Sequence, residues 1–255
     1  MPAVSIREPD EAPPELEALL TALSGLRAGL EGLSGPHTPV FYPNLGTVLA
    51  EYIPGLYAAY DAFVASVLIT ENKRITCSKG CSACCRHYVS SVEPFELIAL
   101  DRHIKSRPDY PELVVSSYRK MEVYQNIANE EGGKGGSEEE AGDRALYRYF
   151  LKGHCCPFLE RDGSCGVYAW RPMACRMFFA ESSPRFCVGK ALASPWNRNF
   201  QVELPQVAEE ALARCSRLLE SLELPEDLFS GLVAVNALFG RYEADGRLSE
   251  HADKG

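Results

Sequence analysis

The sequence predicts a mainly α-helical fold built around an irregular, cysteine-rich centre. Three observations lead to this prediction. Apolar residues recur at helical spacing over most of the chain outside the cysteines. Nine of the ten cysteines fall into two blocks, residues 77–85 and 155–187. The chain has no repeated strand–helix–strand pattern, which would be typical of an α/β protein.

Two helices are predicted before the first cysteine. Pro13 and Pro14 suit a helix start, and six leucines follow at helical spacing up to Leu30. The stretch "SGPHTP" then breaks this pattern. A second helix is expected from about Leu45 to Ile69, interrupted at Pro54-Gly55. Its aromatic residues have the spacing of core residues, and we expect them to pack rather than to line a pocket.

Two further helices are predicted after the first cysteine block. The stretch "SSVEPFELIALDRHIKSR" has a serine near its start and basic residues at its end, and a helix from about Tyr110 to Glu130 follows. The next stretch, "EEGGKGGSEEEAGD", is glycine-rich and acidic and predicts a mobile loop at about 131–142. A short helix, "DRALYRYFL", then leads into the second cysteine block.

The C-terminal part is predicted to be helical again. In "QVAEEALARCSRLLESL", helical spacing places Val207, Ala211, Cys215, Leu218 and Leu222 on one face. Cys215 is therefore expected to be a buried apolar residue. A last helix is predicted in "EDLFSGLVAVNALFGRY", with a frayed tail after it.

These elements suggest three parts of the chain. An N-terminal helical segment covers 1–70, and the cysteine-cluster region covers 71–190, with the helical insertion and loop inside it. The C-terminal helices, 191–255, are expected to pack on the same domain.

Composition excludes some classes of protein. The 255 residues include 26 basic and 35 acidic residues, a formal charge of −9, which argues against a general nucleic-acid binder. The first residues lack the basic and then apolar order of a secretory signal, and no uninterrupted apolar run approaches the ~20 residues of a membrane helix. We therefore expect a cytoplasmic protein without membrane or nucleic-acid partners; a protein partner stays open.

In a reducing cytosol, clustered cysteines favour metal binding or redox chemistry over disulfides. Thiolates are good ligands for zinc and iron, and short C-x₂-C and C-x₃-C spacings let one turn of backbone direct two sulfurs at one ion. The number of cysteines leaves open two zinc ions, a binuclear site, or one iron–sulfur cluster with spare cysteines. Because neighbouring side chains usually diverge, Cys84 and Cys85 need not reach the same metal atom. We expect the two blocks to converge around a shared inorganic centre.

Asp162-Gly163 in the second block predicts a short β-hairpin. A two-residue loop would pair Glu160 with Cys165 and leave Cys156 roughly 13 Å further along the strand. Either the ladder is short and curls, or Cys156 and Cys165 serve different positions of the site.

Two arginines, Arg171 and Arg176, flank Cys175 in "RPMACR". Guanidinium groups near metal-bound thiolates can offset the excess negative charge and donate hydrogen bonds to sulfur. The alternative is that both arginines face solvent.

The cysteine blocks resemble the YkgJ-type cysteine-cluster family, described as a zinc- or iron-chelating domain. The resemblance rests on "CSKGCSACC" and on "CPFLERDGSCGVYAWRPMACRMFF", and it covers roughly Cys77 to Cys187. It implies metal or iron–sulfur binding without a settled biochemical role. Cys155 and Cys215 fall outside the pattern. The resemblance assigns the metal-ligand positions to Cys77, Cys81, Cys84, Cys85, Cys156, Cys165, Cys175 and Cys187.

Three functions are compatible with this pattern. The first is a protein that holds zinc or an iron–sulfur cluster, with a structural role for the metal. The second is an enzyme of the methyl-transfer or radical S-adenosylmethionine type, because the spacing Cys77-x₃-Cys81-x₂-Cys84 is that of a 4Fe–4S site and flagellin lysine N-methylases look similar in this region. Against it, the pattern is helical, and no glycine-rich nucleotide fingerprint follows a strand. The third is a metal or cluster carrier or a redox sensor, for which Cys155, beside His154 and Cys156, is the candidate. Separately, His87 could be a metal ligand or a proton carrier, the alternative being a residue at the surface or beside the ligands.

Overall fold

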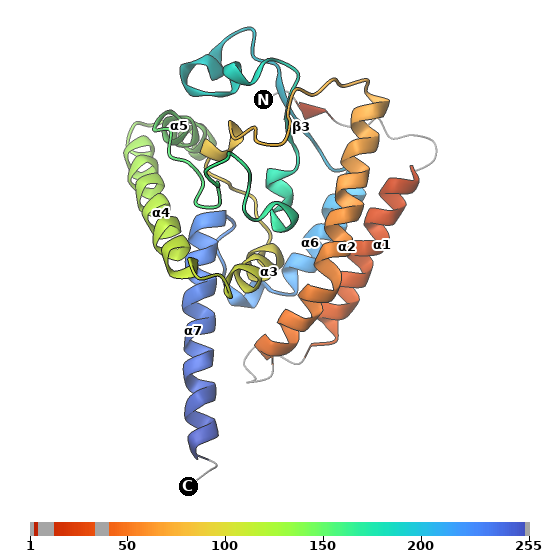
Figure 1. The fold of residues 1–255 in the computed structure, drawn as a ribbon, viewed down its shortest axis with the longest axis vertical. Coiled ribbons are helices and arrows are strands. Elements are labelled where there is room, and N and C mark those ends of the chain that lie inside the picture. Colours follow the sequence, from red (N-terminus) through yellow and green to blue (C-terminus); the bar gives the residue numbers. More distant parts are fainter. Residues whose placement is uncertain (1–2, 5–12, 34–40, 253–255) are drawn as a thin grey trace.

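The computed structural model describes residues 3–4, 13–33 and 41–252 (Figure 1). Within these residues, seven α-helices surround irregular chain and one small β-sheet, so the predicted mainly α class is confirmed. The helices are α1 (Pro14–Glu31), α2 (Phe41–Thr70), α3 (Pro94–Ile104), α4 (Tyr110–Gly132), α5 (Glu138–Leu151), α6 (Gln206–Arg217) and α7 (Leu228–Ala252). The strands are β1 (Ala3–Val4), β2 (Phe178–Ala180) and β3 (Asn199–Val202).

Helices α1 and α2 lie side by side and form one flank of the molecule (Figure 1). The leucines predicted for the first helix include five buried ones, ending at Leu30. The expected interruption at Pro54-Gly55 is wrong, because α2 is continuous through Pro54. Ile53, Leu56 and Tyr57 around the proline are all buried, so their packing outweighs one lost backbone hydrogen bond. The break predicted at "SGPHTP" lies mostly outside the described residues.

Helix α2 has the length and apolar composition of a membrane-spanning helix. This was not predicted from the sequence, because polar residues interrupt the apolar run. By this criterion alone the evidence is weak, since core helices pass the same test. Tyr60 and Phe63 are almost completely buried, in agreement with the core role predicted for the aromatic residues of this segment. The composition of α2 therefore agrees with a helix that packs against α1 and α3.

Helix α3 lies in the centre of the molecule, in contact with α2, α6 and α7. It begins at Pro94 instead of at a serine, with Glu93 and Glu96 forming a reciprocal capping box. The predicted basic end is present, since Arg102 and His103 lie in the last turn. Because Phe95, Leu97 and Leu100 are fully buried, α3 is part of the core that supports the cysteine region.

The loop predicted at about 131–142 is mostly helical, so that prediction is wrong for most of its length. Helix α4 continues to Gly132 and α5 begins at Glu138. Ser137 caps α5 in a capping box with Glu140, which gives the acidic stretch a helix start in place of a coil. The two helices then pack against each other as a pair on the flank opposite α1 and α2 (Figure 1).

An ion-pair cluster around Glu131 holds this helix pair together. The Glu131 carboxylate is 2% exposed and contacts Lys134 at 2.7 Å and Arg144 at 3.1 Å, and it also binds Arg148 from α5. Hydrogen bonds from Lys134 and the two arginines lower the pKa of Glu131 to about 2. Glycine content alone could not reveal these long-range partners.

The C-terminal part is helical as predicted, but the buried face of α6 and the residues after it differs from the predicted apolar face. Cys215 is completely buried, as predicted, and its thiol lies 3.5 Å from the carbonyl oxygen of Leu23 in α1. Val207 and Leu218 are 50% and 40% exposed, so the predicted apolar face is wrong at these positions. The buried side of this segment runs through Ala208, Cys215 and Leu219 instead. Helix α7 continues to Ala252, through most of the tail that was expected to fray.

The sheet was not predicted, since the expected hairpin lies elsewhere, at Asp162-Gly163; its strand order is β1-β3-β2. Strand β1 is parallel to β3, and β2 is antiparallel to β3, with Phe179 opposite Phe200. Residues 181–198 form the connection between β2 and β3 and carry Cys187. The sheet thus fixes the far end of the second cysteine block.

We predict that Glu131→Gln lowers the melting temperature at pH 7, and that the loss shrinks as the pH falls. The pKa of about 2 in the folded protein lies below 4.5, the ordinary pKa of a glutamate side chain. The carboxylate therefore stabilises the fold above pH 4.5, and this contribution is lost between pH 4.5 and 2. Thermal unfolding of both proteins across this range tests the prediction. Glu122→Gln, on the exposed side of α4, is the matched control and should change little. A loss for Glu131→Gln that is independent of pH would contradict the ion-pair explanation.

Candidate metal centre

The two cysteine blocks meet at the centre of the molecule. The backbone N–H of Cys156 donates a 2.7 Å hydrogen bond to the carbonyl oxygen of Cys85. The backbone N–H of Thr76 donates to the carbonyl of Ala180 at 2.7 Å, and its hydroxyl donates to the carbonyl of Ser182 at 2.6 Å. The first block is therefore tied to the second at both of its ends, as the predicted convergence requires.

The eight predicted cysteines fall into two neighbouring groups, defined by which cysteines interact electrostatically with one another. Cys187 interacts with Cys77, Cys81 and Cys84. Cys175 interacts with Cys156, Cys165 and again Cys84. Cys85 interacts with Cys156 and Cys165, which places it with the second set. We call these the Cys187 group (Cys77, Cys81 and Cys187) and the Cys175 group (Cys85, Cys156, Cys165 and Cys175), with Cys84 between them.

The neighbours Cys84 and Cys85 lie close to each other, and the expectation that they need not reach the same metal atom stays a prediction. They lie in the short 3₁₀ turn Cys84–Arg86, where the thiol of Cys85 hydrogen-bonds to the sulfur of Cys84. This hydrogen bond and the charge of Arg171 lower the pKa of Cys84, whereas the pKa of Cys85 is raised. Cys84 is therefore the thiol of this pair that ionises first.

Five further thiols of the site have raised pKa values, which favours their neutral form. Burial raises the pKa of Cys156 to about 12 and also raises the pKa values of Cys77, Cys165, Cys175 and Cys187. The negative charges of neighbouring cysteines add to this shift. Since metal ligation needs thiolates, binding of a metal here must release protons.

The hairpin at Asp162-Gly163 is present with a different register from the one predicted. Its loop has three residues, because Glu160 and Ser164 are joined by a 2.9 Å backbone hydrogen bond and Gly163 has a φ of +82°. Cys165 therefore lies opposite Leu159 instead of Glu160. The ladder ends one residue further, at a 2.8 Å hydrogen bond from the Gly166 N–H to the carbonyl of Phe158, and the chain curls through a hydrogen bond from the Leu159 N–H to the carbonyl of Cys156. Of the two alternatives left open by the sequence, the short, curled ladder is the one observed.

Two glycine turns touch where the blocks meet. Gly80 in the first block has a φ of +87°, and Gly163 in the second has a φ of +82°. A Cβ added at Gly163 would lie 2.8 Å from the carbonyl oxygen of Gly80, which is backbone that cannot rotate away. Only glycine therefore allows the two turns to approach this closely.

The two arginines around Cys175 have different roles. Arg176 is 3% exposed, and its guanidinium donates hydrogen bonds to the carbonyls of Arg171 and Ala169 at 2.8 Å and pairs with Asp61 of α2. It fastens the cysteine turn to the helical flank. Arg171 instead lowers the pKa values of Cys84, Cys165 and Cys175. The predicted role beside the thiols therefore falls mainly to Arg171.

A buried carboxyl group supports the turn that carries Cys175. Glu96 of α3 is completely buried, and its carboxyl oxygen accepts a 2.8 Å hydrogen bond from the backbone N–H of Met173. Burial raises the pKa of Glu96 to about 7. Met173 begins the 3₁₀ turn that ends at Cys175, so Glu96 connects this turn to the core helix.

Sequence reasoning missed one cation near the site. Lys120 of α4 is buried, and its charge lowers the pKa of Cys156. Its position on the buried face of α4, three residues after the buried Ser117, was the available indication. The lysine therefore supplies positive charge to the Cys175 group.

Two further candidate residues, His87 and Cys155, lie in different surroundings from each other. His87 stacks on Phe150 with ring centroids 4.3 Å apart, and burial lowers its pKa to about 4. It is therefore neutral at pH 7 and packs as an aromatic ring. Cys155 is exposed, whereas its neighbour Cys156 is half-buried among the other thiols.

The donor set fits zinc or iron in its chemistry. Soft sulfur donors from both blocks face one another, and Arg171 has a buried Nε without a hydrogen-bond partner among the described residues, where a metal-bound sulfur could accept. Within the same residues, no three His, Cys, Asp or Glu side chains are already close enough to hold an ion. Binding therefore requires the sulfurs to draw together. The assignment of the eight cysteines as ligands stays a prediction.

We predict that Gly163→Ala destabilises the protein more than Gly135→Ala. Both glycines have a φ near +80°, so both alanines pay about 1–2 kcal/mol of backbone strain. Gly135 has open space around its Cα, whereas at Gly163 the new methyl group meets the Gly80 carbonyl and adds roughly 1–3 kcal/mol. Urea unfolding of the two variants measures the difference. Equal losses would show that the two turns do not meet.

Comparison with known families agrees with this site. A family model named CxxCxxCC, with the description "Putative zinc- or iron-chelating domain", matches residues 76–191. Neither the curated proteins nor the solved structures yielded a match to the chain. The matched range contains both cysteine blocks and the helix pair α4–α5 between them. The segment from Thr76 to Ala191 is therefore similar to the CxxCxxCC domain, and the match covers a little under half of the chain.

Proposed function

We propose that this protein binds zinc or iron through the eight cysteines of its two blocks, and that the metal joins the blocks. One observation carries the proposal: backbone hydrogen bonds from Cys156 to Cys85 and from Thr76 to Ala180 bring together two cysteine blocks whose members, such as Cys77 and Cys187, are up to 110 residues apart in the chain. Most of these thiols are partly shielded from water, and thiols are weak hydrogen-bonding groups. A thiolate-bound metal ion would replace their protons and satisfy the sulfurs.

The position of Cys84 favours a shared centre over two independent ones. It interacts with members of both the Cys187 group and the Cys175 group. A thiolate between two groups of thiols suits a binuclear zinc site or an iron–sulfur cluster, because both contain several metal atoms within one shared set of sulfur ligands. The Arg171 guanidinium would offset part of the negative charge of such a centre.

A structural role for the metal follows from where the blocks lie. The hydrogen bonds between Thr76 and residues 180–182 and between Cys85 and Cys156 hold the two blocks in register. Metal bonds across the same junction would add binding free energy to folding free energy. Nothing in the described residues or in the comparisons favours the S-adenosylmethionine-dependent alternative, whose cysteine motif would follow a strand; here it follows α2 and an irregular segment.

The cytoplasmic location is part of this proposal. All ten cysteines are free in the structure, including the exposed Cys84 and Cys155. A reducing compartment would keep them as thiols available to a metal.

Protein purified without oxygen should contain at least one equivalent of zinc or iron per chain. Elemental analysis measures the metal, and the visible spectrum distinguishes a colourless zinc site from a brown iron–sulfur cluster. Chelation should lower the unfolding temperature, because the metal joins the two blocks. Absence of both metals, together with full stability of that preparation, would overturn the proposal.

Cys175→Ser and Cys84→Ser should reduce the metal content and the stability, because each removes a sulfur from the junction of the blocks. Cys215→Ser is the matched control: it is completely buried but lies between α6 and α1, away from the other thiols. It should leave the metal content unchanged, whatever its effect on stability. If Cys215→Ser lost as much metal as Cys175→Ser, the assignment of ligands would be wrong.

A further inference from the structure

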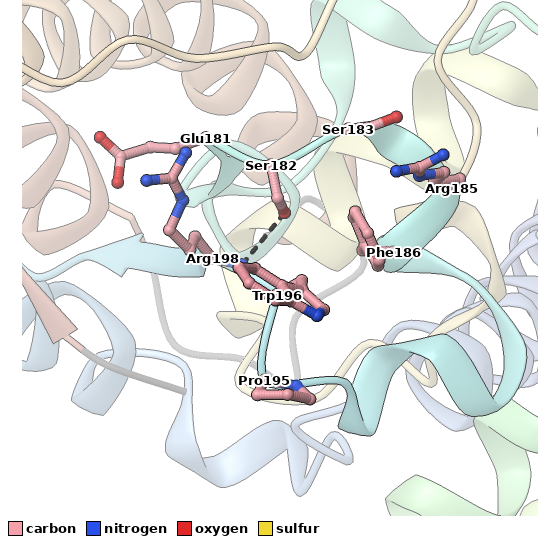
Figure 2. Close-up of a pocket in the computed structure, with 8 residues that line it drawn as sticks. All are labelled: Glu181, Ser182, Ser183, Arg185, Phe186, Pro195, Trp196 and Arg198. Carbon is pink, nitrogen blue, oxygen red and sulfur yellow. Dashed lines mark hydrogen bonds between the residues drawn. The ribbon is translucent and has the colours of Figure 1, made fainter.

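The connection between β2 and β3 contains a surface pocket of about 620 Å³ next to the cysteine site (Figure 2). Its base is closed by backbone hydrogen bonds between Glu181 and Arg198, and the Ser182 hydroxyl accepts a 3.0 Å hydrogen bond from the Arg198 N–H. Arg185 and Phe186 of the short 3₁₀ segment Pro184–Cys187 line the pocket, and this segment ends in a predicted metal ligand. The pocket therefore adjoins the segment that carries Cys187.

The pocket combines aromatic faces with exposed cations. Phe186 and Trp196 lie in its middle, and Arg185 and Arg198 lie to either side of them (Figure 2). Trp196 is 73% exposed, which is unusual for so large an apolar side chain. The guanidinium of Arg185 stacks on Phe186 at 4.7 Å, and among the described residues neither arginine has an ion pair with a carboxylate. Tryptophan and arginine are the residues most enriched in the energetic centres of protein interfaces.

A second hollow, of about 440 Å³, continues the same surface on the other side of Pro184–Cys187. It is lined by Cys81 together with Lys79 and Arg86 of the first cysteine block, and by Pro184 and Val188. The two hollows share the segment that carries Cys187. They therefore form one surface around the edge of the cysteine site.

The segments that form this surface carry a charge opposite to that of the rest of the chain, and the lining itself contains Lys79, Arg86, Arg185 and Arg198 against the single carboxylate of Glu181. Residues 73–88 and 171–198 contain nine basic residues and one acidic residue, Glu181. They carry a formal +8 in a chain of −9, so the other residues carry −17. Glu181 itself lies 3.9 Å from Lys73. Compensation of the thiols explains only part of this excess, because the cations that chiefly lower cysteine pKa values are Arg171, Arg176 and Lys120.

We propose that this surface, formed by Arg185, Phe186, Trp196 and Arg198 together with Lys79, binds an acidic segment of a partner protein that also carries apolar or aromatic side chains. The acidic residues would contact the arginines, and an apolar side chain would lie between Phe186 and Trp196. A short acidic segment needs only this local positive charge. A long nucleic acid would also meet the −17 charge of the remaining chain. A small ligand would need a more enclosed site than one in which Trp196 is 73% exposed.

The experiment is a selection from a random library of 12-residue peptides displayed on phage, with the full-length protein as bait. The selected peptides should be enriched in Asp and Glu next to Phe, Trp, Tyr or Leu. Affinities of the best peptide are then measured by fluorescence anisotropy. Arg185→Glu combined with Arg198→Glu should weaken binding at least about 10-fold, and Trp196→Ala should weaken it to a similar extent. Binding to the wild type should also weaken as salt is raised.

Arg119→Glu, an exposed charge reversal on α4, is the control and should leave the affinity unchanged. The surface variants replace exposed side chains, so their metal content and melting temperature should equal those of the wild type. This separates the present proposal from the metal proposal, which fails or holds independently of peptide binding. Peptides without acidic enrichment, or equal affinity for the double variant, would overturn it. So would preferred binding of a single-stranded DNA 12-mer, or a dimer of the wild type that the double variant dissociates.

Discussion

The close approach of two remote groups of thiols is the constraint on which the rest of this structure depends. Removing a thiol from water favours its neutral form, and each additional thiol nearby makes ionisation of its neighbours harder. The raised pKa values of Cys156, Cys175 and Cys187 reflect this unfavourable ionisation. A soft metal ion reverses the balance, because it takes the charge of the thiolates and replaces their protons. The site is therefore built for a ligand that neutralises sulfur.

The helices provide the rigid support that irregular chain lacks. Arg176 reaches Asp61 of α2, Glu96 of α3 holds the Met173 turn, and Lys120 of α4 lies near Cys156. Arg176, Glu96 and Lys120 are buried, and the three contacts join the cysteine region to three different helices. A buried polar group is stable only where its partner is fixed, so these contacts position the cysteine turns as well as stabilise them. The helical flanks and the cysteine site are thus one energetic unit.

Positive charge, like the thiols, is concentrated in a few segments of the chain. The segments that carry most of the cysteines are basic, whereas the remaining chain is strongly acidic. The half-buried Arg171 and the buried Arg176 belong to the cysteine centre and its support, while Arg185 and Arg198 lie outside it on an open surface with Trp196. This separation explains why a single count of net charge describes the protein poorly.

The sequence by itself determined the fold class, the start of α1, the burial of Cys215 and the presence of a cysteine-cluster domain, because helical periodicity and cysteine spacing are local patterns. It could not determine the course of α2 through Pro54 or the helical ends around Glu131, since those depend on packing and on ion pairs with distant residues. The register at Gly163 and the pairing of Cys84 with Cys85 also depended on contacts between the blocks. Local patterns name the elements and the sulfur donors; which thiols lie together is decided by tertiary packing, because side chains more than 100 residues apart have no shared local geometry.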